Sequence, residues 1–148
     1  VLSPELSGTT KTEIIEELVH LAACAGRIQD VDAALAAVLE REDAGSTGMQ
    51  SGVAIPHGIT TGVREVVCAV GLKQEGVDFD SFDGEPSRIF VLVLSPKDRT
   101  GGYLRVLATI SQTLNEQGRA ALLKCHTAEQ MHACIASEGA QNRKSGGA

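Results

Sequence analysis

Three runs of almost uninterrupted apolar residues do most to limit what this chain can fold into. The two longer runs are residues 66–72 and 89–94, and a short one, residues 53–55, precedes them. Each has the length of a β-strand, and a strand that is apolar at nearly every position is buried on both faces. The sequence therefore predicts a sheet that helices cover on both sides.

Helical patterns precede the first apolar run. Thr10, three residues before a glutamate, forms a capping box that opens an amphipathic stretch, and Gly26 can end this helix. Asp30 can cap a second helix with one apolar face. A polar, glycine-rich loop at residues 44–48 then leads to the short apolar run. Pro56 stops that run, so we expect a strand to end there.

Further helical patterns follow the last apolar run. Apolar residues at helical spacing fill residues 104–114, a shorter helix is expected at 119–123, and Thr127 begins a capping box for a final helix. Between the two longer runs, residues 76–86 are rich in turn formers and can hold a short strand or hairpin. The order of helices, strands and helices predicts an α/β or α+β sandwich.

The length and composition indicate one globular domain. The chain has 148 residues, of which 43% are hydrophobic and 22% are charged, as in an ordinary single-core protein. We expect one domain over residues 1–148, with an ordered core from about residue 5 to 137. Residues 138–148 are small and polar, which predicts a flexible tail.

The net charge of −6 limits the classes of partner. An acidic chain without a basic cluster is a poor nucleic-acid binder, although it can suit a basic protein. No segment reaches the roughly 18 apolar residues of a membrane span, and the N-terminus lacks a signal pattern. None of the four cysteines belongs to a C-x-x-C pair, so we expect reduced thiols and a cytoplasmic location.

His57 is the first candidate functional residue. It lies between Pro56 and Gly58, directly after a predicted buried strand. Proline stiffens the approach to the histidine, and glycine lets another molecule's backbone come close. A neutral imidazole near pH 7 is a competent nucleophile and proton carrier. The alternative on these residues alone is a solvent-exposed loop histidine with no task.

Arg41 and the loop after it are candidates for binding an anion. Arg41 ends a predicted helix just before the glycine-rich loop, and a guanidinium matches the oxygens of a phosphate. Ser46, Thr47 and Gly48 can donate hydrogen bonds to the same anion. Each has a plainer explanation, because arginine is favoured in a last helical turn and the three others can be only a loop.

Other classes of function fit the sequence less well. A metal site is conceivable, but the spacing of its four potential ligands matches no standard zinc pattern; they are Cys125, His126, His132 and Cys134. The chain has no G-x-S-x-G motif of a serine hydrolase and no P-loop for direct use of ATP. A pure interaction module without phosphate chemistry stays open. We therefore expect no metal and no cofactor.

The motifs around His57 resemble the active-site signature of a known family. The similarity is to the enzyme IIA domains, fructose/mannitol class, of the phosphoenolpyruvate-dependent sugar phosphotransferase system. It spans about residues 5–137, nearly the whole chain. The matching residues are Arg41-Glu42, Ser46-Thr47-Gly48, the run 52–58 (GVAIPHG), the runs 76–80 and 83–86, and the stretches 89–96 and 104–114.

This resemblance implies an α/β fold in which a small mixed β-sheet is sandwiched between helices on both faces. It implies that His57 accepts a phosphoryl group from the phosphohistidine of HPr or an HPr-like carrier, and that Arg41 lies near that phosphohistidine. The phosphoryl group would pass to a IIB partner. Stand-alone members resemble the nitrogen-branch regulatory IIA proteins, which signal by binding other proteins, so a regulated target is the alternative partner.

Tyr103 marks a departure from the family's pattern. The family often has a second histidine, followed by leucine, at the start of the helix after the third strand, and here that pair reads Tyr103-Leu104. The substitution favours a regulatory or divergent member over an efficient sugar phosphotransferase. A tyrosine hydroxyl can still donate one hydrogen bond to a phosphate or to the imidazole, so Tyr103 joins the candidate supporting residues.

Overall fold

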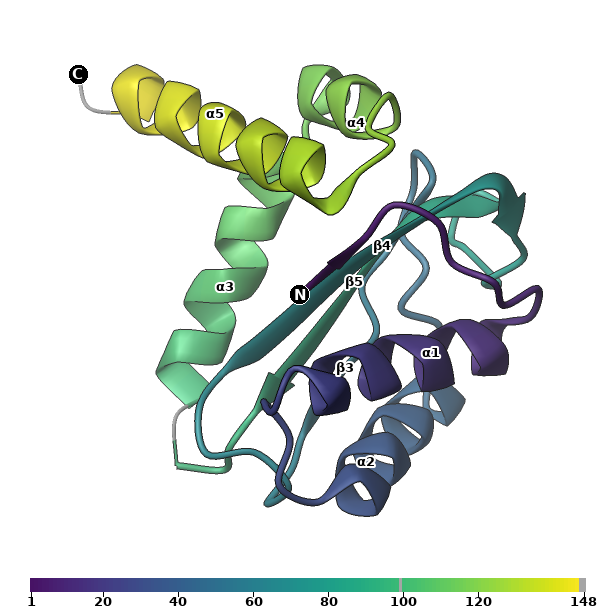
Figure 1. Ribbon diagram of the computed structural model, residues 1–148. Coiled ribbons are helices and arrows are strands. Elements are labelled where there is room, and N and C mark those ends of the chain that lie inside the picture. The colour runs from purple at the N-terminus through teal and green to yellow at the C-terminus, as the bar shows by residue number, and fades with distance from the viewer. Residues whose placement is uncertain (99, 147–148) are drawn as a thin grey trace.

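A mixed β-sheet forms the middle layer of the molecule, and helices cover both of its faces (Figure 1). The computed structural model describes residues 1–98 and 100–146. Helices α1 (Lys11–Cys24) and α2 (Val31–Asp43) pack on one face. Helix α3 (Thr100–Thr113) packs on the other, accompanied by α4 (Glu116–Leu122) and α5 (Ala128–Gly146). The expected α/β sandwich is confirmed.

The predicted helix caps are present. The Thr10 hydroxyl accepts a hydrogen bond from the Glu13 N–H at 3.2 Å, and the Asp30 carboxylate accepts one from the Ala33 N–H at 3.0 Å. At the start of α5, Thr127 accepts a bond from the Gln130 N–H at 3.1 Å. These bonds satisfy N–H groups that the first turn of a helix leaves without a partner.

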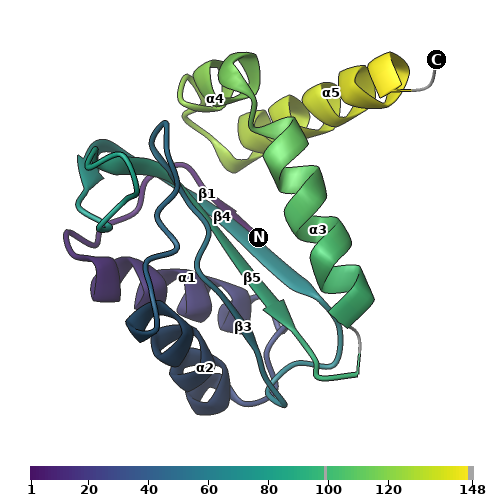
Figure 2. The same cartoon turned by 180° about the vertical axis from the view of Figure 1, so that it is seen from behind.

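Five strands make up the sheet in the described part of the chain. Strands β4 (Val67–Val77) and β5 (Ser87–Ser95) form an antiparallel pair at its centre, and β1 (Leu2–Ser3) runs parallel to β4. Strands β2 (Val53–Ala54) and β3 (His57–Ile59) both run parallel to β5. Seen from behind, β3 lies beside β5 and next to α2 (Figure 2).

Strands β2 and β3 behave as one edge strand that Pro56 interrupts. Ala54 pairs with Phe90 and His57 pairs with Val93, three residues further along both strands, so the register does not change. The prediction that a strand ends at Pro56 therefore needs a correction, because pairing resumes immediately and His57 lies in a strand. Proline lacks an N–H, but its carbonyl still accepts a bond from the Val93 N–H at 3.0 Å.

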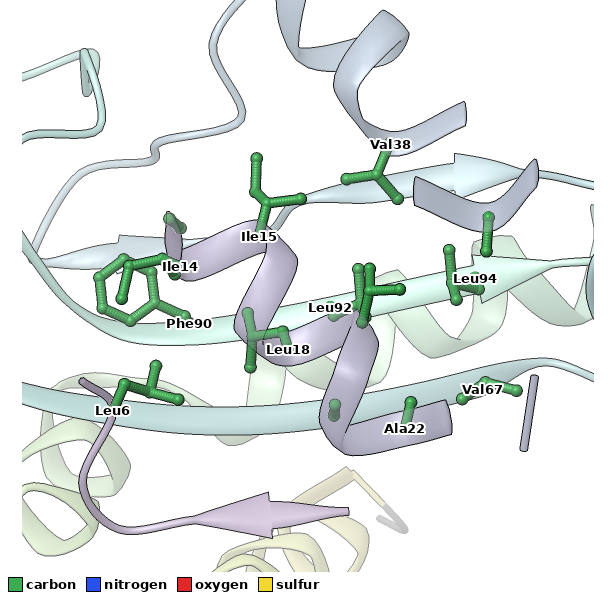
Figure 3. Close-up of a cluster of buried hydrophobic side chains, with 14 of the residues drawn as sticks. Leu6, Ile14, Ile15, Leu18, Ala22, Val38, Val67, Phe90, Leu92 and Leu94 are labelled. Atoms are coloured by element: carbon green, nitrogen blue, oxygen red, sulfur yellow. The ribbon is translucent and has the colours of Figure 1, made fainter. Parts of the chain in front are cut away.

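The core has two halves, one on each face of the sheet, and β5 contributes to both. Phe90, Leu92 and Leu94 point towards α1 and α2 (Figure 3), whereas Ile89, Val91 and Val93 belong to the cluster under α3, α4 and α5. All six are at most 2% exposed. This burial on both faces explains why the run is continuously apolar.

The C-terminal segment is helical in the structure, where the backbone of α5 continues through Gly146. The flexible tail that the polar composition predicts from residue 138 stays a prediction. Residues 147–148 of that predicted tail lie outside the described residues. No helix in the described ranges is long and apolar enough to cross a membrane.

Candidate functional site

A cavity of about 230 Å³ opens beside His57 at the edge of the sheet. Its walls come from α2, the loop after α2, the β2–β3 segment and α3. The cavity brings together four of the residues that the sequence singles out. The lining residues are Arg41, Ser46, Thr47, Met49, Ile55, His57, Leu107 and Ser111.

The imidazole of His57 is held in a defined orientation. Its Nδ1 lies 2.7 Å from the carbonyl oxygen of Ile55, two residues earlier in the chain. A carbonyl oxygen can only accept a hydrogen bond, so in the neutral ring the proton sits on Nδ1 and the lone pair on Nε2. The half-buried ring is thereby set up to use Nε2 as a nucleophile.

Arg41 lies in the last turn of α2 and is half-buried. Its Nη1 donates a hydrogen bond to the Gly45 carbonyl at 2.7 Å, so the side chain folds back over the loop after the helix. A guanidinium has five N–H donors, and this bond uses one of them. The remaining donors are therefore available for an anion in the cavity.

The hydroxyls of Ser46 and Thr47 are directed into the protein. Ser46 Oγ donates to the Phe79 carbonyl at 2.6 Å and accepts the Gly48 N–H at 3.0 Å. The Thr47 N–H donates to Glu42 Oε1 at 2.9 Å, and its hydroxyl donates to the other oxygen of that carboxylate. Both side chains thus stabilise the loop. Because their hydroxyls already donate hydrogen bonds within the protein, a supporting role is favoured over direct binding of an anion.

Gly58 comes directly after His57 in β3 and faces the opposite side of the strand. A Cβ at this position would lie 3.1 Å from the backbone of Ala37 and Val38 in α2. The absence of a side chain therefore lets α2 pack closely on the strand. This contact within the chain gives the glycine a structural reason of its own, while the approach of another molecule that the sequence suggests stays a prediction.

Tyr103 stands on α3 against the histidine. The two ring centroids are 5.7 Å apart with an interplanar angle of 53°, and Tyr103 is 8% exposed. Burial raises the pKa of the Tyr103 hydroxyl above 10.0, and the nearby charge of Arg41 partly opposes the rise. The hydroxyl is therefore neutral near pH 7. Tyr103 thus contacts the ring of His57 and is close enough to Arg41 for that charge to affect its pKa.

Sequence reasoning missed several residues of the site. Leu107 and Ser111 come after Tyr103 at intervals of four, so they share one face of α3 and line the cavity below it. The single polar member of that face, Ser111, was the available signal. The buried Glu42 under the loop gave a weaker signal, as the neighbour of Arg41 in the matching motif.

The described residues include no group of three or more histidine, cysteine or acidic side chains placed to hold a metal ion. None of the four cysteines forms a disulfide bond in the structure. The cavity beside His57 is therefore the site with the best-defined chemistry.

Comparison with known proteins decides the family. The model of the family described as "Phosphoenolpyruvate-dependent sugar phosphotransferase system, EIIA 2" matches residues 2–138, which is nearly the whole chain. The chain belongs to this family. Being an EIIA domain, it is a phosphoryl-carrying component of that transfer system.

Relatives of this EIIA domain include transport and regulatory proteins. It is 36% identical over 137 residues to the PTS system fructose-specific EIIA component of Haloferax volcanii, covering 92% of this chain and 89% of that protein. The crystal structure of nitrogen regulatory protein IIA-Ntr from Neisseria meningitidis is 28% identical, with a TM-score of 0.77 over 90% of this chain and 92% of that one.

A third similar protein is known in a complex. The complex of enzyme IIA-mannitol and phosphorylated enzyme IIB-mannitol from Escherichia coli gives a TM-score of 0.79 at 17% identity, covering 92% of this EIIA chain and 94% of that chain. At this identity the likeness supports the common fold alone.

Proposed function

We propose that this EIIA domain carries a phosphoryl group on Nε2 of His57. The donor is the phosphohistidine of HPr or an HPr-like carrier, and the acceptor is an EIIB partner or, in a regulatory role, a target protein that responds to the phosphorylation state. The observation that carries the proposal is the orientation of His57: the Ile55 carbonyl binds Nδ1 while the ring lines a cavity that also contains Arg41.

The transfer step needs no cofactor. The Nε2 lone pair of His57 forms a bond to phosphorus while the bond from phosphorus to the donor's imidazole nitrogen breaks, and the electron pair of that bond stays with the donor's ring. The proton on Nδ1 of His57 remains in place. The Ile55 carbonyl then stabilises the positive charge that the ring gains on phosphorylation, because this N–H becomes a stronger donor.

Arg41 supplies the fixed positive charge of the proposed mechanism. The phosphoryl group keeps its negative charge throughout transfer, and a cation held in advance where that charge lies lowers the barrier. The bond to the Gly45 carbonyl holds the guanidinium before the partner arrives. Ser46, Thr47 and Gly58 support this arrangement through the loop and through the packing of α2.

Tyr103 replaces a second cation with a neutral donor. Its hydroxyl can donate one hydrogen bond to the phosphoryl group or to the imidazole. Because its pKa is raised above 10.0, the side chain contributes no charge near pH 7. The site then depends on Arg41 for its positive charge, which favours slower transfer and a regulatory use of the phosphorylated state.

The surroundings of the cavity suit a protein partner. Three apolar side chains near His57 are exposed to solvent: Met49 by 50%, Leu104 by 64% and Ile59 by 44%. Met49 lines the cavity itself, Leu104 comes directly after Tyr103, and Ile59 lies two residues after His57. A partner that covers them excludes water from the reacting groups. We place these exchanges in the cytoplasm, where the system's phosphoryl carriers meet.

The alternative function is a regulatory interaction module whose partner binding depends on the phosphorylation of His57, or does not depend on phosphate at all. The similarity to IIA-Ntr favours this alternative, as does the tyrosine at position 103. The two phosphate-dependent roles share the phosphoacceptor and differ in the step after phosphorylation. Transfer from the phosphorylated domain to EIIB marks a carrier, whereas a change in affinity for a target marks a regulator.

The experiment is phosphorylation by phosphoenolpyruvate, enzyme I and HPr. We expect one phosphate per chain, labile in acid and stable in base, with ¹⁵N and ³¹P NMR signals of a phosphohistidine substituted at Nε2. His57→Ala should abolish labelling, while the control His20→Ala, which removes an exposed histidine of α1, should not. Labelling of His57→Ala at the parent's level would refute the phosphoacceptor assignment. Phosphate on Nδ1 would refute the proposed orientation.

A further inference from the structure

Glu42 is a buried carboxylate that the transfer mechanism leaves without a task. It is 7% exposed and lies in α2, next to Arg41. Oε1 accepts the Thr47 N–H at 2.9 Å and contacts Lys11 Nζ at 2.9 Å, and Oε2 accepts the Thr47 hydroxyl. A buried carboxylate is costly without partners, and here three donors satisfy it.

Lys11, in α1, connects this carboxylate to the segment that follows β4. Its ammonium also contacts Asp80 at 3.1 Å, in the turn after β4, and lies 5.1 Å from the centroid of the Phe79 ring. Burial lowers the pKa of Lys11, but the hydrogen bonds and charges of Glu42 and Asp80 outweigh that effect, so the pKa is raised above 10.5. Glu42 therefore keeps a cationic partner near pH 7.

The carboxylate of Glu42 closes the short loop that links α2 to Thr47. Gly45 lies inside that loop; its N–H donates to the Glu42 carbonyl at 3.2 Å, and its own carbonyl receives Arg41 Nη1 at 2.7 Å. The position of the guanidinium therefore depends on the shape of the loop. The bond from Thr47 to Glu42 fixes that shape at its far end.

The same clamp reaches His57 through the backbone. The Thr47 carbonyl accepts the Ile55 N–H at 3.0 Å, and the Ile55 carbonyl contacts His57 Nδ1 at 2.7 Å. Two branches thus start at the bonds between the Glu42 carboxylate and Thr47. One follows the loop backbone from Thr47 back to Gly45, whose carbonyl binds the arginine, and the other runs through the Thr47 carbonyl and Ile55 to the histidine.

We infer that Glu42 is the positioning residue of this site, whose buried carboxylate fixes the Arg41 guanidinium relative to the His57 imidazole. This inference rests on the proposed function only for its effect on transfer, because the placement of Arg41 can be measured without any phosphate. Loss of the clamp should slow phosphorylation of His57 by up to about a hundredfold, the loss that a misplacement of about 1 Å can cause.

The chain contains one tyrosine and no tryptophan, so tyrosinate absorbance reports on Tyr103 alone. The charge of Arg41 lowers the pKa of Tyr103, and Arg41→Ala should therefore raise the titration midpoint. Glu42→Ala should raise it in the same direction if the guanidinium moves away. Simple removal of a negative charge would lower the midpoint, so the sign separates displacement of Arg41 from a direct charge effect.

The double variant Arg41→Ala/Glu42→Ala tests whether Glu42 acts through the arginine. We expect its Tyr103 midpoint to be no higher than that of Arg41→Ala, and its transfer rate to be close to that of Arg41→Ala alone. Residues that act through one another show such non-additive effects. A midpoint in Glu42→Ala at or below the parent value, or independent losses of rate in the double variant, would overturn the inference.

Glu17→Ala is the matched control. Glu17 is a second carboxylate that clamps a backbone loop, since it accepts the N–H groups of Ser7 at 2.9 Å and Gly8 at 2.9 Å, at the start of the chain. Its removal should loosen that segment yet leave the Tyr103 midpoint and the transfer rate at parent values. A shift as large as that of Glu42→Ala would mean that any lost clamp disturbs the site, which would refute a special role for Glu42.

Thr47→Val keeps the inference testable if Glu42→Ala fails to fold. Valine has nearly the shape of threonine and removes only the hydroxyl that binds Glu42. We expect a smaller rise of the Tyr103 midpoint and slower transfer, with Thr47→Ser restoring both; parent behaviour in Thr47→Val would count against the clamp. If His57 is not the phosphoacceptor, the parent fails to label, while the Tyr103 titration still reports where Arg41 lies.

Discussion

The ring of Tyr103 packs at a tilt against the ring of His57, with the two centroids 5.7 Å apart. Tyr103 comes from α3 on one face of the sheet, whereas Arg41 comes from α2 on the other. They can meet at one histidine because β3 lies at the edge of the sheet, where the two helical layers approach each other.

The ionisation of Tyr103 should lower stability at alkaline pH. Because burial disfavours the tyrosinate, the unfolded chain loses this proton first, so the contribution to stability is complete below pH 10.0 and is lost as the pH rises through the raised folded-state pKa. We expect a spectrophotometric midpoint above 10.0 in the folded protein. A midpoint at the value of a model tyrosine would contradict the buried position.

Substitution of Tyr103 should change the rate of phosphoryl transfer. Tyr103→Phe keeps the ring and removes the hydroxyl, so we expect transfer to slow about fivefold, the factor for a hydrogen bond worth about 1 kcal/mol. Tyr103→His should speed transfer, since an imidazolium can stabilise the phosphoryl charge. Both rates can be measured with phosphorylated HPr in excess. Identical rates for both variants and the parent would leave Tyr103 with packing alone.

Arg41→Lys should separate the charge of this residue from its geometry. Lysine keeps the positive charge but loses the planar fork, which binds the Gly45 carbonyl while offering other donors to the phosphoryl group. We expect transfer to slow by roughly tenfold to a hundredfold, the range for a charged hydrogen bond of about 1.5–3 kcal/mol. Urea denaturation should show nearly unchanged stability. Parent transfer rates in Arg41→Ala would remove this residue from the site.

Gly58→Ala should destabilise the fold. The new Cβ would lie 3.1 Å from the α2 backbone, which cannot yield as a flexible side chain would. We expect a loss of about 1–3 kcal/mol in the free energy of unfolding, the usual cost of overpacking. Gly101→Ala is the control, because a Cβ there has no atom within 4 Å and helix α3 should gain stability. Equal stabilities for Gly58→Ala and the parent would contradict the close packing of α2 on β3.

Patterns local in sequence predicted most of the fold. The continuous apolar run of β5 indicated burial on both faces, and Thr10, Asp30 and Thr127 marked helix starts that the structure contains. The strand break at Pro56 was only half right. A missing N–H is visible in the sequence, but the resumption of pairing depends on Val93, which lies far along the chain.

For the candidate site, too, local motifs predicted the residues, whereas contacts between distant parts of the chain could not be predicted. Motif spacing picked out His57, Arg41, Ser46 and Thr47, and the structure gathers them around one cavity, although their roles stay predictions. The ion pair of the buried Glu42 with Lys11 could not be inferred, because Lys11 lies in another helix. The spacing of residues within one helix does not reveal an ion pair with a residue of another helix.

Because the register is unbroken across Pro56, the number of residues between Ala54 and His57 decides which side of the sheet the histidine faces. Neighbouring residues of a strand point to opposite sides, so His57 faces Tyr103 while Gly58 faces α2. Adding or deleting one residue between Ala54 and His57 would exchange these directions and turn the imidazole into the α2 layer. The length of this segment therefore matters as well as the identity of its residues, because only an even change in length keeps the imidazole facing Tyr103.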